Sequence, residues 1–386
     1  MASIYRNRNV WLFGLISLGT DLASQMIVPF VPGFLTQLGA NKSLIGLIEG
    51  IADTTAALMR AVFGRMTDQY GHHKGFIALG YGLSNLSKPF LYLASAPWQV
   101  LGIRFLDRLG KAARNPARDA LLAASVSETD RGQAFGFNRA LDRAGAIGGP
   151  LLALLVLHIW PGNIPMVFLW AAVPAILTLL LIPLIRTRQI LTRKLDAKTA
   201  APLHNQPFSG FLIANTLFTL GSVSDAFIIL RATELGITVY QIPWLWMGYN
   251  AVCVVSAQVL GVVSDRVPRR RMILFSYGCF AGVMAGMALA SHGWHIWALT
   301  AGYGVYYGLS AGVYKAYVAD LVPAARRASA FGVFSTFEGL AILPAALMMG
   351  ALWDTMGSKV AFGLPVACAL LAMFFLIGWT RRQQQA

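Results

Sequence analysis

Charged residues, cysteine and histidine are all scarce in this sequence. Only 12% of the 386 residues are charged, about half the share in an average soluble domain, whereas 56% are hydrophobic. The three cysteines lie in apolar stretches and the six histidines lie in loops or at span ends, so we expect no disulfide, metal site or cofactor. No polar segment is long enough for a separate catalytic domain. These absences exclude a soluble, disordered or disulfide-stabilised protein, and the composition predicts a polytopic membrane protein.

Apolar stretches at least as long as a membrane span, about 20 residues, predict twelve transmembrane helices. We expect the first six near residues 10–35, 44–66, 76–96, 98–122, 131–156 and 162–185. The other six are expected near 208–232, 243–264, 272–290, 296–322, 330–352 and 359–379. Between them, the polar stretch 186–207 predicts a flexible cytoplasmic linker. The predicted fold is therefore an all-α polytopic membrane protein with two six-helix bundles, 1–185 and 208–386.

Positive charge is distributed unevenly between the two ends of these spans. The net charge is +15, and most basic residues fall in the termini and in alternate loops, whereas only Lys42 and Lys359 fall in the opposite loops. Cytoplasmic loops of membrane proteins carry such an excess of lysine and arginine. We therefore expect a multi-pass protein of the cell (inner) membrane with both termini in the cytoplasm. The charge is interpreted as a topology signal, and no nucleic-acid partner is expected.

Short motifs recur in the same order in both halves, at a spacing of about 197 residues. The matching pairs are Thr36-Gln-Leu-Gly39 with Thr233-Glu-Leu-Gly236, Gly64-Arg-Met-Thr-Asp68 with Gly261-Val-Val-Ser-Asp265, and Arg131-Gly-Gln-Ala-Phe-Gly136 with Arg327-Ala-Ser-Ala-Phe-Gly332. Six residues after the last glycine of each pair stands an acid, Asp142 and Glu338. Internal repeats are typical of transporters whose substrate site lies between the repeats. The duplication predicts two pseudo-symmetric bundles with a central cavity.

The loop after the second span of each half carries a longer motif. The first copy reads Gly64-Arg-Met-Thr-Asp-Gln-Tyr-Gly-His-His-Lys74, and the second reads Gly261-Val-Val-Ser-Asp-Arg-Val-Pro-Arg-Arg-Arg271. Both resemble the signature loop G-x-x-x-D-R/K-x-G-R-R/K of the major facilitator superfamily, which the chain resembles over essentially its whole length. Gln69, His72, His73 and Pro268 depart from that pattern. The resemblance implies a loop that latches one conformation, through Gly64, Asp68, Gly71, Gly261, Asp265 and Arg266.

Two further stretches are similar to motifs of the same family. Arg104-Phe-Leu-Asp-Arg-Leu-Gly110 is similar to an element of the fourth span that is associated with proton coupling, with Asp107 and Arg108 at variant positions. In the fifth span, Gly136, Gly145, Gly149 and Pro150 have the spacing of the antiporter motif, whereas Ala153 and Leu154 replace its final glycine pair. These glycines imply antiport by resemblance, or they serve helix packing alone.

Acidic residues occur deep inside several predicted spans, where a charge costs about 3 kcal/mol on insertion scales. Asp21 lies about eleven residues into the first span, which at about 1.5 Å per residue puts it near the membrane midplane. Asp21 can take up and release a proton, or it can form a fixed ion pair with Arg104 or Arg108. The sequence leaves both interpretations open. The acids that we consider for proton coupling are Asp21, Asp53, Asp142, Asp225 and Glu338.

The fourth span carries a track of basic residues. Arg104, Arg108 and Lys111 share one helical face at i, i+4 and i+7, and Asp107 lies beside them. If the track faces a cavity, it favours an anionic solute, because guanidinium groups bind carboxylate or phosphate in a two-pronged arrangement. Pairing of these cations with nearby aspartates is the alternative interpretation.

Tyrosines are concentrated in the tenth span. Tyr303, Tyr307 and Tyr314 can share one face and offer both ring surface and hydroxyl groups. They can line a substrate cavity, or they can pack between glycine-rich helices. The family resemblance implies that the first, fourth, seventh and tenth spans line the cavity, so these tyrosines are expected near it.

The features together predict a secondary active transporter that moves a small solute by alternating access. We favour proton-coupled export by antiport; the alternatives are proton-coupled uptake of an anionic solute, such as an organic acid, phosphate ester or metal chelate, and a non-transporting membrane receptor. An enzyme is not expected, because the one G-x-S-x-G match, Gly308-Leu-Ser-Ala-Gly312, lies inside a span and is interpreted as helix packing. The expected partners are the solute, protons and membrane lipids, and the expected state is a monomer.

Overall fold

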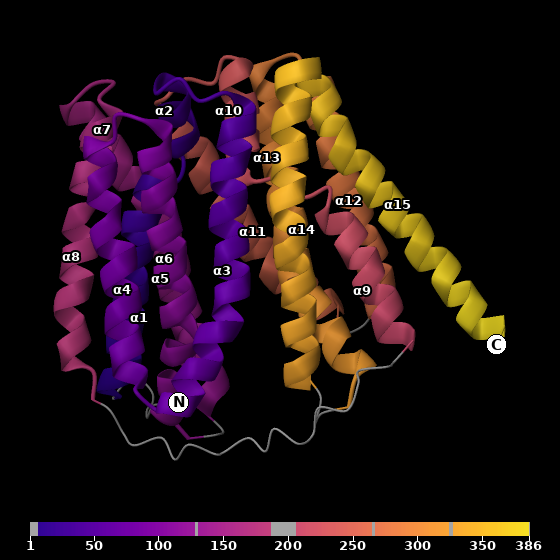
Figure 1. The fold of residues 1–386 in the computed structure, drawn as a ribbon, viewed down its shortest axis with the longest axis horizontal. Helices are drawn as coiled ribbons and strands as arrows, with labels where there is room; N and C mark the ends of the chain where they lie inside the picture. The colour runs from indigo at the N-terminus through magenta and orange to yellow at the C-terminus, as the bar shows by residue number, and fades with distance from the viewer. Residues whose placement is uncertain (1–6, 128–129, 187–205, 265–266, 324–326, 386) are drawn as a thin grey trace. The chain divides into compact units, whose positions relative to one another are not determined.

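The computed structural model describes residues 7–127, 130–186, 206–264, 267–323 and 327–385. These residues are helical apart from short connections, and no strand is found among them (Figure 1). Their contacts divide the helices into two compact units. The first unit contains α1 (Arg8–Ile27), α2 (Val31–Gln37), α4 (His73–Ser87), η2 (Lys88–Leu93), α5 (Pro97–Ala124), α6 (Arg131–Ile159), α7 (Ile164–Trp170), α8 (Ala172–Leu181) and η4 (Ile182–Leu184).

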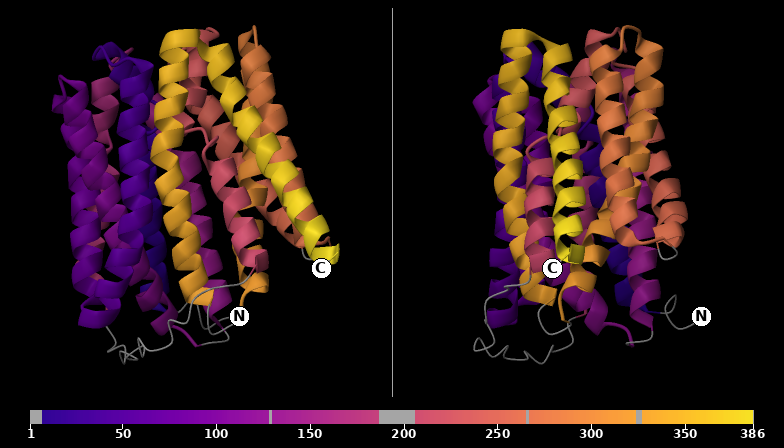
Figure 2. Two further views of the ribbon diagram at one scale, coloured as in Figure 1. Left: turned by 45° about the vertical axis from the view of Figure 1, so that its right-hand side comes forward. Right: turned by 90° about the vertical axis from the view of Figure 1, so that its right-hand side faces the viewer.

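The second unit contains α9 (Gln206–Thr219), α10 (Asp225–Glu234), α11 (Ile242–Ser264), α12 (Arg269–Leu289), α13 (Gly293–Leu321), α14 (Arg327–Met356) and α15 (Ser358–Gln385). One further helix, α3 (Lys42–Tyr70), divides at its middle, with residues up to Thr54 in the second unit and residues from Thr55 in the first. Within each unit the helices run side by side, and α15 is tilted relative to α14 (Figure 2). The predicted linker, 186–207, lies almost entirely outside the described residues.

Each of the twelve predicted spans coincides with described helices, but several spans are interrupted. The first is divided between α1 and α2, and the seventh between α9 and α10. The sixth is divided into α7, α8 and η4, and the third changes from α-helix to 3-10 helix at Lys88. Proline accounts for the change at Lys88, since Pro89 lacks the amide hydrogen that would continue the α-helical pattern.

Six described stretches are long and apolar enough to cross a membrane, judged by length and composition alone. They are Arg8–Gln37, Arg131–Ile159, Ile164–Leu184, Arg269–Leu289, Ala330–Met356 and Ser358–Trp379. Helix α5, which holds the basic track, is not among them. A helix with that many charges can lie in a membrane only if the charges face other parts of the protein or water.

Glycines with positive φ end equivalent helices in the two halves. Gly39 follows α2 with φ 84°, and Gly236 follows α10 with φ 86°. Gly162 follows α6 with φ 72°, and Gly357 follows α14 with φ 83°. Glycine adopts this left-handed conformation without the penalty that a side chain would impose. The repeated Thr-x-Leu-Gly motif is therefore a helix-ending signal, used once in each half.

The first unit begins and finishes at the same end of its helices. The side chain of Asn9, at the start of α1, donates to the carbonyl of Arg186 at 2.9 Å and accepts from the amide of Arg186 at 3.1 Å. Nearby, Nζ of Lys74 donates to the carbonyls of Pro183 and Ile185 at 2.9 Å. An even number of crossings between Asn9 and Arg186 follows from these contacts.

The first turn of α3 is held by an acidic side chain of the second unit. Asp354 accepts hydrogen bonds from the amide of Lys42 at 2.9 Å, from the amide of Ser43 at 2.7 Å and from the Ser43 hydroxyl at 2.6 Å. The first amides of a helix have no partner within the helix, and a negative charge there is favourable. Asp354 thus caps α3 from α14.

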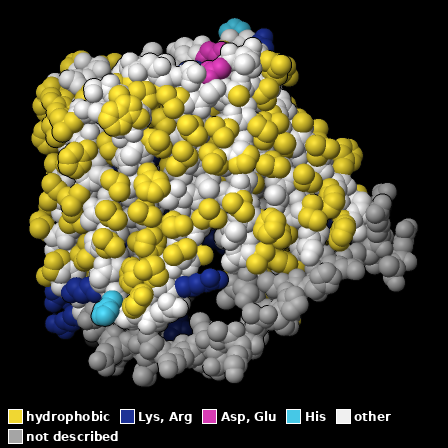
Figure 3. Space-filling model, in the orientation of Figure 1, with side chains coloured by type: hydrophobic (Ala, Val, Ile, Leu, Met, Phe, Trp, Pro, Cys, Tyr) yellow, Lys and Arg dark blue, Asp and Glu magenta, His cyan; other side chains and the backbone are white. Residues whose placement is uncertain are grey.

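Large apolar side chains cover the outer surface. Leu93 is 67% exposed, Leu180 is 65% exposed and Phe374 is 71% exposed. On the face drawn in Figure 3, hydrophobic side chains form a broad band, and lysine and arginine gather below it. Such a surface is stable against lipid and not against water.

Candidate functional site

Helices α4 and α5 cross at two glycines. A Cβ atom on Gly80 would lie 2.6 Å from the carbonyl oxygen of Gly110, and one on Gly110 would lie 2.7 Å from the amide nitrogen of Ser84. Only glycine lets two backbones approach this closely. The crossing brings polar residues of α4 and η2 against those of α5.

Lys88, Asp107 and Lys111 form an ion cluster beside this crossing. The Asp107 carboxylate lies 3.6 Å from Nζ of Lys88 and 3.3 Å from Nζ of Lys111, and it accepts a hydrogen bond from the Ser84 hydroxyl at 2.6 Å. Lys88 also donates to Oδ1 of Asn85 at 2.9 Å. Lys88 and Asp107 are buried, whereas the Lys111 side chain is 19% exposed. Two ammonium groups share one carboxylate, so the cluster carries an excess of positive charge when all three groups are ionised.

Arg114 lies one helical turn after Lys111 on α5 and is also buried. Its guanidinium group stacks over the Tyr81 ring, 4.3 Å from the centroid. Its Nε and Nη1 atoms are buried and have no hydrogen-bond partner among the described residues. A buried guanidinium normally has its donors satisfied, because an unsatisfied donor costs free energy. Arg114 therefore stands out as a buried cation with unused donors.

Asp21 lies where α1 crosses α6. A Cβ atom on Gly145 would lie 2.5 Å from the Leu18 carbonyl oxygen and 3.0 Å from the Asp21 Cβ, and one on Gly149 would lie 2.8 Å from the Gln25 Cβ. Two glycines of the predicted antiporter motif thus serve a close helix contact. The contact holds Asp21 against α6.

The surroundings of Asp21 contain charges of both signs. Asp142, Lys88, Lys111 and Arg114 all lie within electrostatic range of its carboxylate. Among the described residues, Asp21 makes no hydrogen bond and no ion pair, and its role stays a prediction. Three predicted site residues, Asp21, Asp142 and Lys111, therefore fall in one region of the first unit.

Hydrogen bonds fix α1 to its neighbours next to this region. Asn138 of α6 donates to the carbonyl of Phe13 at 3.1 Å and to the hydroxyl of Ser17 at 2.9 Å. Arg118 of α5 donates to the same hydroxyl at 3.2 Å and pairs with Asp119 at 2.9 Å. These contacts position the helix that carries Asp21.

Arg104 and Arg108 lie on the same helix as this cluster. Arg104 is buried and Arg108 is half-buried, and each has further interactions. The predicted basic track is thus a real feature of α5. The structure divides it into a deep part, with Asp107 and Arg114, and a more accessible part, with Arg108 and Lys111.

A second group of predicted residues lies in the second unit. Tyr249 of α11 stacks on Tyr303 of α13, with ring centroids 5.5 Å apart, and meets Tyr307 edge to face at 6.3 Å. Asp225, the first residue of α10, lies within electrostatic range of Tyr249 and Tyr303. Tyr303 is buried, whereas Tyr307 is 43% exposed. This group combines a half-buried carboxylate with aromatic surface.

Tyr314 lies apart from this group. Its hydroxyl is 2.8 Å from that of Ser276, and its ring packs against Phe211, Phe218 and Tyr277. Such contacts are those of an aromatic core, so the packing alternative describes Tyr314 better than the cavity alternative. The remaining candidates of this unit, Asp53 and Glu338, are half-buried and engaged in further interactions.

The predicted latch is only partly described. A Cβ atom on Gly64 would lie 3.8 Å from the Cβ of Pro116, which is an ordinary van der Waals contact. Gly71 has a positive φ of 65°. The side chain of Asp68 is not described, Gly261 lies within α11, and Asp265 and Arg266 lie outside the described residues. The latch therefore stays a prediction.

The G-x-S-x-G match is a helix contact, as interpreted from the sequence. A Cβ atom on Gly308 would lie 2.8 Å from the Ala257 amide nitrogen and the same distance from the Cys253 carbonyl oxygen. Gly308 therefore lets α13 approach α11. Ser310 donates to the Tyr307 carbonyl within the same helix at 3.3 Å.

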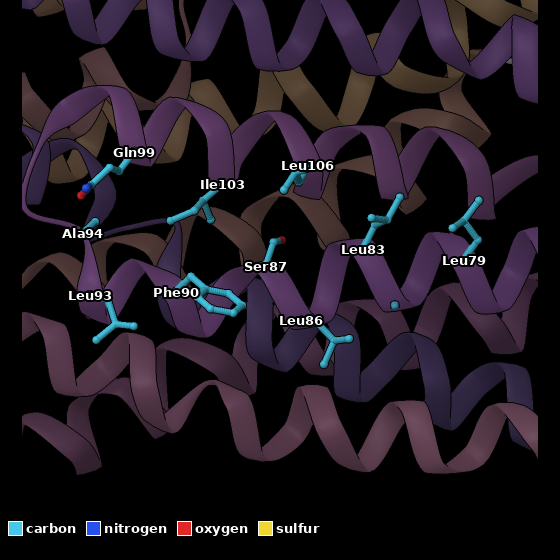
Figure 4. Close-up of a pocket in the computed structure, with 11 residues that line it drawn as sticks. Leu79, Leu83, Leu86, Ser87, Phe90, Leu93, Ala94, Gln99, Ile103 and Leu106 are labelled. Carbon is cyan, nitrogen blue, oxygen red and sulfur yellow. The ribbon is translucent and has the colours of Figure 1, made fainter.

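An apolar groove of about 660 Å³ runs between α4, η2 and α5 (Figure 4). The polar side chains that line it are Ser87 and Gln99. Several of the lining side chains, such as Leu86 and Phe90, are more than half exposed. None of the predicted site residues lines this groove, and its surface fits hydrocarbon rather than a polar solute.

Sequence reasoning missed several partners of the predicted residues. Lys88 was visible as a charge in the third span, but its contact with Asp107 depends on the α4–α5 crossing. Ser84 and Asn85 precede it by one turn on the same face, and this i, i+3, i+4 pattern is a signal that the sequence contains. Tyr249 has no comparable signal, because only the tertiary contact brings it to Tyr303.

Comparisons with known proteins agree with this architecture. The family model "Major Facilitator Superfamily" matches residues 13–346 and 208–385. An MFS-type transporter of Methanocaldococcus jannaschii is 32% identical over 354 residues, covering 90% of this chain and 89% of the relative. The multi-drug resistance efflux pump PmrA of Streptococcus pneumoniae is 25% identical over 284 residues, or 69% of each chain.

A solved structure has the same fold at low sequence identity. The crystal structure of a point mutant of the nucleoside transporter NupG superposes with a TM-score of 0.83 at 12% identity, covering 96% of this chain and 100% of that one. It supports two pseudo-symmetric six-helix bundles, as the sequence repeat predicted. The chain therefore belongs to the major facilitator superfamily and is a multi-pass membrane transporter of that family.

Proposed function

We propose that the protein exports a small solute in exchange for protons, by alternating access. The carrying observation is the position of Asp21, which the close α1–α6 contact at Gly145 holds against α6 in the electrostatic environment of Asp142. The similarity to an efflux pump supports the direction. Asp21 is the proposed proton carrier because it lies inside the helical region without an ion pair among the described residues.

The remaining acids and helices have proposed roles in the same cycle. Asp142 shares the electrostatic environment of Asp21, and Asp225 stands at the break of the seventh span. Asp53 and Glu338 are retained as further proton-coupling candidates. We propose that residues 1–185 and 208–386 move as two bundles joined by the linker 186–207, in a monomer of the cell (inner) membrane with both termini cytoplasmic.

Flux measurements in proteoliposomes test the coupling. Purified protein is reconstituted, a pH gradient is imposed, and solute accumulation is followed for the parent chain and for Asp21→Asn. We expect the substitution to abolish gradient-driven accumulation while solute binding persists, because an amide cannot carry the proton. Asp320→Asn is the matched control, since Asp320 is 53% exposed and pairs with Arg269 at the end of α13. Undiminished concentrative flux in Asp21→Asn would contradict the assignment.

A second candidate function is proton-coupled uptake of an anionic solute. The excess of buried positive charge around Asp107 favours it. The same proteoliposomes separate the two functions. Export by antiport requires solute to move against the proton flow, whereas uptake requires both to move together.

A further inference from the structure

We propose that Lys88, Lys111 and Arg114 form a binding site for an anionic group, carboxylate or phosphate, of the transported solute. The proposal rests on the proposed function only in that the protein moves a small solute, and it does not depend on the direction of transport. It adds Lys88 and Arg114 to the residues predicted from the sequence. It also names the chemical class of the substrate.

The first argument is the charge of the cluster. Lys88 and Lys111 both approach Asp107, at 3.6 and 3.3 Å, and the Lys88 side chain is only 5% exposed. A buried charge is costly unless a counter-charge lies in direct contact, and Asp107 is the carboxylate in contact with both ammonium groups. Asp21 and Asp142 lie within electrostatic range but form no ion pair with either lysine among the described residues, so an anion placed between the lysines would add a direct contact.

The second argument compares two buried arginines of the same chain. Arg231 donates to the carbonyls of Met287 and Ala290 at 3.0 and 2.7 Å, to Ser358 at 2.8 Å and to Glu234 at 2.9 Å. All three of its nitrogens have partners, as expected for a structural arginine.

Arg114 is buried to a similar extent but differs in its partners. Its Nε and Nη1 have no hydrogen-bond partner among the described residues, while its ring contact with Tyr81 fixes the plane of the group. The unpaired Nε and Nη1 hydrogens lie on different edges of the guanidinium, so each can donate a single hydrogen bond to an oxygen of a carboxylate or phosphate. The unused donors of Arg114 are therefore the second feature that fits an anion.

The third argument concerns access. Lys111 is 19% exposed and Arg108, one turn before it, is half-buried, so the edge of the cluster can be reached while Lys88 and Arg114 lie deeper. The α4–α5 crossing at Gly80 and Gly110 fixes the spacing between the two helices. The cations are therefore held in place before any ligand arrives, which lowers the entropy cost of binding.

Ligand-induced thermal stabilisation tests the site without a gradient. The full-length protein in detergent is heated with inorganic phosphate, citrate or benzoate, and separately with benzamide and benzamidine as neutral and cationic counterparts of benzoate. Unfolding is followed by tryptophan fluorescence. We expect at least one anion, and neither counterpart, to raise the melting temperature at millimolar concentration. Stabilisation by none of the anions, or equally by benzamide and benzamidine, overturns the proposal.

Variants connect the effect to the three cations. We expect Lys88→Gln and Arg114→Gln each to weaken the apparent affinity for the stabilising anion about tenfold or more, the effect of losing about 1.4 kcal/mol. Lys88→Arg should restore binding, and Lys359→Gln, at an exposed lysine of the second unit, should leave it unchanged. If a Gln variant fails to fold, the anion affinities of Lys88→Arg and Arg114→Lys are compared with that of the parent chain. Both variants keep the charge, and Arg114→Lys should weaken binding because it removes the guanidinium donors. An unchanged affinity in folded Gln variants overturns the assignment.

An anionic lipid headgroup carries the same phosphate group as a solute and could occupy the same site, so a separate experiment distinguishes the two. The protein is also placed in nanodiscs of phosphatidylcholine with and without phosphatidylglycerol. Stabilisation by soluble anions in both lipids supports a solute site, whereas stabilisation by phosphatidylglycerol alone overturns it in favour of a lipid site. Because no gradient is present, these measurements do not depend on proton coupling, and their failure is distinguishable from a failure of the proposed antiport.

Discussion

Arg231 shows what a buried structural charge needs in this protein. Its guanidinium links the end of α12, the start of α15 and Glu234 within α10, and every nitrogen has a partner. Lys88 and Arg114 are buried to a similar extent, but Lys88 shares its one carboxylate partner with Lys111, and Arg114 has two nitrogens without a hydrogen-bond partner among the described residues. The difference separates charges that hold the fold from charges that are available for a ligand.

We expect Arg231→Gln to lower the free energy of unfolding by about 2 kcal/mol or more, because its loss leaves buried carbonyl acceptors without a donor. The Met287 and Ala290 carbonyls would lose their donor. Unfolding by sodium dodecyl sulfate in mixed micelles measures the change. Arg271→Gln, at an exposed arginine, is the control, with an expected change within about 0.5 kcal/mol. Equal stability of the two variants would mean that Arg231 is dispensable.

At the scale of helices, glycines decide where two spans meet. Gly80 and Gly110 set the α4–α5 crossing, Gly145 and Gly149 the α1–α6 crossing, and Gly308 the α11–α13 crossing. Other glycines of the same helices, such as Gly82, Gly102 and Gly136, have no atom within 4 Å of a Cβ placed there. Spacing in the sequence alone does not separate the two classes, because the facing helix determines whether a Cβ atom has room.

Gly145 and Gly136 allow a matched test within α6. A Cβ atom on Gly145 would lie 2.5 Å from the Leu18 carbonyl oxygen, whereas one on Gly136 has no atom within 4 Å. We expect Gly145→Val to lower the free energy of unfolding by about 1–3 kcal/mol or more and to impair flux. Gly136→Val should change both little. The same micelle unfolding and flux assays give the comparison, and similar effects at both sites would refute the crossing as the cause.

The molecule as a whole is organised by its duplication and its charge asymmetry. Both halves break their first span and end the following helix at a positive-φ glycine, Gly39 or Gly236. The match to the family model agrees with this repeat, because members of the superfamily have two related halves. The Asn9–Arg186 contacts leave two possible orientations for the first unit, and the lysine and arginine distribution predicts the one with cytoplasmic termini.

Cysteine labelling tests the orientation. In a background without Cys253, Cys279 and Cys368, single cysteines are introduced as Gln69→Cys and Lys359→Cys, both at exposed positions. A membrane-impermeant maleimide should label the Lys359 variant in intact cells and the Gln69 variant only after permeabilisation, because Gln69 lies in a loop predicted to be cytoplasmic. The reverse pattern would mean that the topology is inverted.

The amino-acid sequence by itself determined the class of protein, the approximate spans, the repeat and the family. These features depend on local composition and on periodicity, so they can be read without knowing which helices meet. The breaks of the first, sixth and seventh spans were not predicted, because a hydrophobic stretch has the same composition whether or not its helix is continuous.

Only the tertiary structure decided which charges meet. Lys88 pairs with Asp107 because two glycines let α4 and α5 approach, and Arg114 stacks on Tyr81 with its Nε and Nη1 unpaired among the described residues. Asp21 lies against Gly145 for the same steric reason. Such contacts join residues on different helices, and their distances depend on helix packing, which a linear pattern does not encode.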